Sequence, residues 1–184
     1  MDRRELLALI AAATGAAFVE GCARSGPPPA TFGADDIAFF DEVAETIMPR
    51  TDTPGAKDAH VGAYIATYAE ACYELGDLAV LKAGIGALNA EMERRFAVDF
   101  MRATPAQRTS ALIEIDREAH QHARATADME GSTPHYFTLM KQLTLNGFFT
   151  SELGATKVAR YRPVPGKYKG VIDYKPGETF WAWA

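Results

Sequence analysis

Apolar residues recur at helical spacing in five separate segments of this 184-residue chain, and this periodicity constrains the fold more than any other feature. In the first segment, residues 34–48, Ile37, Phe40, Ala44 and Ile47 fall on one face of a helix, with acidic residues between them. Further segments of this kind cover about residues 61–74, about residues 78–101, a stretch that begins at Thr104, and residues 133–150. We therefore predict an all-α fold, a compact bundle of about five helices.

Two short motifs refine this prediction. Thr104 and Gln107 flank Pro105 in the pattern of a capping box, so a helix should begin there. Gly84 and Gly86 resemble the start of a dinucleotide-binding fingerprint, but the third glycine and a preceding strand are missing. We expect both glycines to permit close helix packing instead.

Composition and charge define the organisation of the chain. Hydrophobic residues make up 48% and charged residues 23%, which is typical of a soluble, folded domain. We divide the chain into an export signal (1–22), a proline-rich tether (23–33), a helical domain (34–160) and an irregular C-terminal arm (161–184). The formal charge is -5 overall, whereas the residues from 157 onward carry six basic and two acidic side chains.

The first 22 residues have the features of an export signal. Arg3 and Arg4 precede an uncharged run that is too short to span a bilayer, which resembles a twin-arginine signal. An ordinary secretory leader is the alternative. The run ends at Cys22 in a sequence similar to a lipoprotein cleavage box, from which Glu20 departs, so lipidation of Cys22 is expected and cleavage elsewhere is the alternative.

The C-terminal arm carries the strongest functional signal, because its prolines and glycines exclude a long helix while its aromatic side chains are costly to leave in water. Aromatic residues and arginine dominate the binding energy of protein interfaces. We predict that the arm docks on a partner protein; the alternative is that it wraps its own bundle. The predicted docking residues are Tyr161, Arg162, Pro163, Pro165, Tyr168, Tyr174, Phe180, Trp181 and Trp183. The acidic body and the export signal argue against nucleic acid as the partner.

Catalytic and metal-binding patterns are weak throughout the sequence. Glu118 and His122 lie one helical turn apart, and without a second ligand motif we interpret them as a surface ion pair. We find no motif for a serine nucleophile, a haem or another cofactor. Cys72 would be the only thiol left after lipidation and could form an intersubunit disulfide, although a small buried residue on a helix is the expected role.

Four segments together resemble one known family. They are the leader from Met1 to Leu7, the loop from Pro49 to Ala56, the helix from Tyr136 to Thr144, and the run from Gly147 to Gly170. Over essentially its whole length the chain is similar to the gluconate 2-dehydrogenase subunit 3 family. The resemblance implies a non-catalytic subunit bound to a large FAD-dependent flavoprotein of the glucose-methanol-choline type, often with a cytochrome c that carries haem.

The resemblance also implies where the complex works and on what. The flavin and the substrate site belong to the large subunit, which can cross the membrane folded and bound to the small one. We therefore expect a periplasmic, membrane-associated protein without a cofactor of its own. Substrates of similar complexes include gluconate, glucose and glycosides oxidised at carbon 3. The alternatives are a free-standing envelope lipoprotein that binds another partner and a self-contained periplasmic oxidoreductase.

Overall fold

The computed structural model describes residues 31–129, 131–164, 166–167, 170–171, 173 and 175–180. The helices are α2 (Ala34–Ile47), α3 (Val61–Cys72), α4 (Leu75–Phe96), α5 (Pro105–Ala125) and α6 (Tyr136–Thr150), followed by a short π-helix, η1 (Gly154–Val158). The described residues form no strand. The predicted all-α fold is thus confirmed. All these helices belong to one compact unit, which begins at residue 32.

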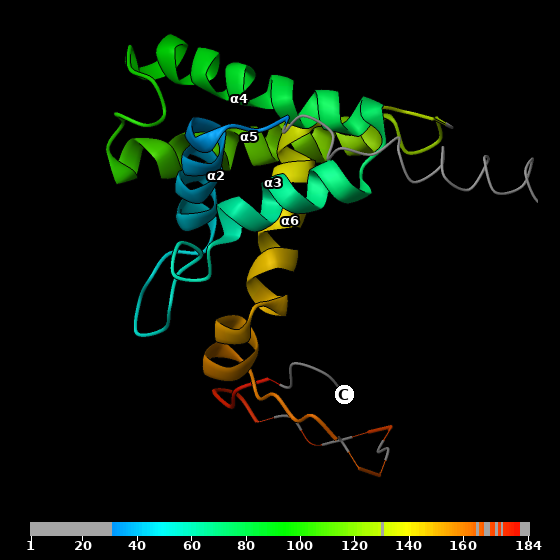
Figure 1. The fold of residues 1–184 in the computed structure, drawn as a ribbon. Helices are drawn as coiled ribbons and strands as arrows, with labels where there is room; N and C mark the ends of the chain where they lie inside the picture. The colour runs from blue at the N-terminus through cyan, green and yellow to red at the C-terminus, as the bar shows by residue number, and fades with distance from the viewer. Residues whose placement is uncertain are drawn as a thin grey trace, which may run out of the picture. The chain divides into compact units, whose positions relative to one another are not determined.

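Helix α6 is the centre of this unit. It packs against α2, α3, α4 and α5, and Figure 1 shows it in yellow among them. A helix with neighbours on several sides must be apolar on most of its surface, and α6 carries one charged side chain, Lys141, in 15 residues. Its buried side chains include Phe137, Met140 and Phe148. The core of the unit is therefore arranged around α6.

The third predicted helix ends earlier than the sequence pattern suggests. We predicted about residues 78–101, whereas α4 ends at Phe96, and Ala97 adopts a left-handed conformation with φ of 54°. The turn inserts Phe100 into the core, where it is fully buried and its ring centroid lies 5.3 Å from that of Phe39. The Asn89 Oδ1 accepts a hydrogen bond from the Phe100 N–H at 3.0 Å and holds the turn in place.

The predicted start of the fourth helix is confirmed. The Gln107 N–H donates to the Thr104 Oγ1 at 3.4 Å, and the Thr104 N–H donates to the Gln107 Oε1 at 2.9 Å, which completes the capping box. Of Gly84 and Gly86 in α4, only Gly84 is at a close contact, since a Cβ there would lie 2.7 Å from the Cβ of Tyr136. Gly86 faces open space, so the prediction of close packing was wrong for this glycine.

No helix among the described residues combines sufficient length with sufficient hydropathy to cross a bilayer.

Candidate functional site

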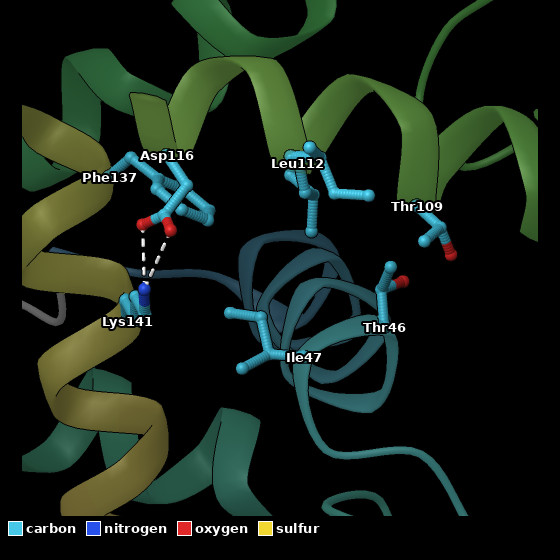
Figure 2. A pocket seen from close by; sticks show the side chains of 8 residues that line it. Thr46, Ile47, Thr109, Leu112, Asp116, Phe137 and Lys141 are labelled. Carbon is cyan, nitrogen blue, oxygen red and sulfur yellow. Dashed lines mark hydrogen bonds and ion pairs between the residues drawn. The ribbon is translucent and has the colours of Figure 1, made fainter. Parts of the chain in front are cut away.

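An open groove of about 160 Å³ lies where the end of α2 meets α5 and the first turns of α6 (Figure 2). It is mainly apolar: Leu112 and Phe137 are buried beneath it, whereas Ile113 is 48% exposed. The lining residues are Thr46, Ile47, Thr109, Leu112, Ile113, Asp116, Phe137 and Lys141. Sequence reasoning did not find this groove, because its residues come from three separate helices.

The polar groups of the groove already have partners within the domain. Lys141 Nζ donates to both carboxylate oxygens of Asp116, at 2.7 and 2.8 Å, as the dashed lines in Figure 2 show. The hydroxyls of Thr46 and Thr109 donate to the backbone carbonyls of Glu42 and Pro105, four residues earlier in their helices, at 2.8 and 3.0 Å. Because these polar groups are paired with one another or with the backbone, the groove suits the packing of an apolar group more than proton transfer. Proton transfer needs an acid or a base that can reach a substrate.

His122 and His135 both lie at the junction between α5 and α6. The His122 Nε2 lies 2.9 Å from the Thr133 carbonyl oxygen, and the His135 Nδ1 accepts the Phe137 N–H at 3.2 Å as the cap of α6. The predicted ion pair between Glu118 and His122 was wrong, because Glu118 instead lies 3.7 Å from Arg95. Among the described residues, no cluster of three or more acidic, histidine or cysteine side chains is suited to a metal ion.

The His135 cap should make the domain sensitive to acid. Burial, followed by the nearby His122, lowers the pKa of His135 from its ordinary value of 6.5. The unfolded chain therefore takes up this proton first, so the stabilisation is present above about pH 6.5 and is lost as the pH falls below it. The variant His135→Asn keeps a capping acceptor but cannot take up this proton. We expect its free energy of unfolding, measured with urea, to fall less between pH 7.5 and pH 5.5 than that of the wild type.

The control for this experiment is His120→Asn, at an exposed position of α5. It should retain the full response of the wild type to acid. An identical acid response in the wild type and in His135→Asn would contradict the prediction.

The loop between α2 and α3, which carries part of the family resemblance, is tightly ordered. The backbone N–H groups of Arg50 and Lys57 both donate to the carboxylate of Glu45 at 2.9 Å. Asp58 accepts from the Arg50 Nε at 2.8 Å and from the Gly55 N–H at 2.9 Å, and the Arg50 guanidinium is the main cause of the lowered pKa of Asp58. A Cβ at Gly55 would lie 2.6 Å from the backbone nitrogen of Arg50, which cannot move aside as a side chain can, so glycine is required there.

The arm follows η1 beyond the C-terminal end of α6, in orange and red in Figure 1. Every described residue from Arg160 to Phe180 is exposed, with Tyr161 at 51%, Val164 at 78% and Val171 at 91%. Phe180, near the end of the arm, lies beside the residue where the arm begins, because the Arg160 N–H donates to the Phe180 carbonyl oxygen at 2.8 Å. The Phe180 ring also meets that of Phe149 edge to face, with centroids 5.7 Å apart.

The predicted site residues are only partly described. Tyr161, Arg162, Pro163 and Phe180 lie in the exposed arm. Pro165, Tyr168, Tyr174, Trp181 and Trp183 lie outside the described residues, as do Arg3, Arg4 and Cys22. The thiol of Cys72 is free and exposed at the end of α3, so the expected buried role was wrong.

These features define a small helical domain with an open apolar groove, polar groups paired internally and an exposed C-terminal arm. The chain belongs to the gluconate 2-dehydrogenase subunit 3 family, whose model matches residues 34–166, from the start of α2 into the arm. Membership in this family implies association with a larger dehydrogenase complex. No curated protein and no solved structure matches the chain.

Proposed function

We propose that this chain is the non-catalytic small subunit of a periplasmic, FAD-dependent sugar or sugar-acid dehydrogenase, and that it supports folding and twin-arginine export of the catalytic flavoprotein. The family match over residues 34–166 carries the proposal. In this proposal the FAD and the substrate site belong to the large subunit, and a haem c, where a cytochrome takes part, belongs to a third. The substrate class is that of gluconate, glucose or glycosides.

The role of the arm within this proposal is docking on the large subunit. Its described residues are exposed, and they combine aromatic and branched apolar side chains with basic ones. Among them, Tyr161, Arg162 and Phe180 belong to the aromatic and arginine types that are enriched at interfaces. The contacts of Phe180 with Phe149 and Arg160 favour an arm that forms a closed loop on the end of α6. In this proposal the residues between Arg160 and Phe180 contact the partner.

The export role is tested by replacing Arg3 and Arg4 with lysine. The twin-arginine machinery distinguishes arginine from lysine, so we expect the double variant to leave most of the flavoprotein in the cytoplasm as an active complex. Dehydrogenase activity is measured in periplasmic and cytoplasmic fractions of cells that express both subunits. Removing the small subunit altogether is the reference for complete retention.

Two results would contradict the proposal. Normal periplasmic activity in the lysine double variant would reject the export role. Flavin absorbance and sugar oxidation by the purified small subunit alone would favour a self-contained oxidoreductase instead.

Lipidation is tested with Cys22→Ala, and Cys72→Ser is a control that also removes one thiol. If Cys22 carries the lipid, we expect Cys22→Ala to release the small subunit from the membrane fraction without a change in its melting temperature, while Cys72→Ser remains bound. The proposed intersubunit disulfide through the exposed Cys72 predicts a reducible cross-linked band on gels that is missing in Cys72→Ser. Membrane binding that is equal in both variants would leave no role for lipid at Cys22.

A further inference from the structure

One side of the helical unit is almost free of charge, although the unit as a whole is acidic. Residues 32–156 carry 10 basic and 19 acidic side chains. Helices α4 and α5 contain 12 of these charged residues within 43 positions, whereas α3 and α6 contain two, Glu70 and Lys141, within 27. Both are engaged inside the unit, since Glu70 accepts the Phe32 N–H at 2.9 Å and Lys141 pairs with Asp116.

The exposed part of α3 consists of tyrosines and small residues. Ala63, Thr67 and Ala71 recur every four residues and are exposed, with the half-buried Tyr64 and Tyr68 beside them. The two tyrosine rings stack with centroids 5.4 Å apart. Tyrosine is enriched and charge is depleted in the central part of protein interfaces. We call these five residues the α3 face.

The α3 face continues onto α6 and from there to the arm. The ring of Tyr64 lies directly over Gly147, where a Cβ would come within 2.5 Å of its Cδ1. The exposed Asn146 and Thr150 flank this contact on α6, and Phe149 on the same helix packs against Phe180 of the arm. A single partner that binds the arm can therefore cover α3 and α6 as well.

We propose that the large catalytic subunit of the dehydrogenase complex covers the α3 face together with the neighbouring surface of α6, in continuity with the arm. This inference rests on the proposed function, because it assigns a surface to the partner named there. An uncharged surface costs little to dehydrate, which suits a permanent subunit contact, whereas contacts steered by charge would use the charged faces of α4 and α5. Family membership supplies a larger protein as the occupant.

The test introduces a charge at the centre of the α3 face. Thr67→Arg and Thr67→Glu are compared with Ala87→Arg and Ala87→Glu, at an exposed position of α4. A charge buried in an interface without a partner weakens binding by about 30-fold or more. We expect both Thr67 variants to lose at least this much affinity for the purified flavoprotein subunit and both Ala87 variants to bind as the wild type does, with all four isolated subunits melting close to the wild-type temperature.

Three outcomes would overturn the inference, and they are distinguishable. Normal binding of both Thr67 variants, with a wild-type complex that forms, rejects the α3 face alone. If the wild type itself forms no complex with the flavoprotein, the proposed function fails and the inference fails with it. If the wild-type subunit is a dimer in light scattering that Thr67→Arg makes monomeric, while the flavoprotein still binds normally, a second copy of the chain covers this face.

Discussion

Deleting residues 174–184 is expected to weaken the complex with the flavoprotein by about 1,000-fold while leaving the melting temperature of the isolated subunit nearly unchanged. The deletion removes Tyr174, Phe180, Trp181 and Trp183. Aromatic anchors of interfaces cost about 2 kcal/mol or more each when truncated, and two such anchors already account for about this factor. The described residues of the arm are exposed, so their loss removes little packing from the bundle. Binding is measured by titration and stability by thermal unfolding.

The control for this deletion is Phe180→Ala, which removes only the described contact of the arm with Phe149. We expect it to bind more tightly than the truncated chain. A truncated subunit that melts much earlier, yet binds its partner normally while folded, would show that the arm wraps its own bundle. Such a loss would resemble the truncation of buried aromatic side chains, which costs about 3–5 kcal/mol.

Replacing Gly84 by alanine is expected to destabilise the domain by about 2–3 kcal/mol, because overpacking a tight contact costs this much. The new Cβ would lie 2.7 Å from the Cβ of Tyr136 and 2.9 Å from its Cγ. A Cβ atom is fixed to the backbone, so relief requires α4 and the first turn of α6 to separate. At about 2–4 °C for each kcal/mol in a chain of this size, the melting temperature should fall by about 4–12 °C.

Gly86→Ala, two residues further along α4, is the matched control. An added Cβ meets nothing within 4 Å there, and Gly86 is exposed. Alanine in an exposed helix interior is more stable than glycine by about 0.5–1 kcal/mol, so this variant should melt slightly higher than the wild type. Equal effects of the two substitutions would contradict the packing of Gly84 against Tyr136.

The contrast between these glycines shows where sequence reasoning reached its limit. Both occur in one helical pattern, and the sequence gives no sign of which one faces another helix. The same limit applies to Cys72, which was expected to be buried and is exposed, and to Glu118, which pairs with Arg95 on α4 and not with His122. In each case the outcome depends on a neighbour from another element.

Among the candidate surfaces, those formed by one segment of the chain were predicted and those formed by several helices were not. The arm was predicted as an irregular, aromatic segment from its prolines, glycines and aromatic residues, and its described part is exposed. The groove between α2, α5 and α6 was not predicted, because no single segment carries its pattern. The α3 face had a visible signal, one charged residue in the 12 of α3, but its continuation onto α6 depends on the contact of Tyr64 with Gly147.

The sequence by itself determined the fold class, the approximate helix ranges, the start of α5 at its capping box and the family. The family rests on the resemblance of four segments to known members. The other features follow from periodicity and from hydrogen bonds that span only a few residues, so each depends on one continuous segment of the chain. The tertiary structure decided that α4 ends at Phe96, which glycine of α4 needs to lack a side chain, and which residues share a surface. Those outcomes depend on the burial of Phe100 and on close packing between helices, and both are properties of segments far apart in the sequence.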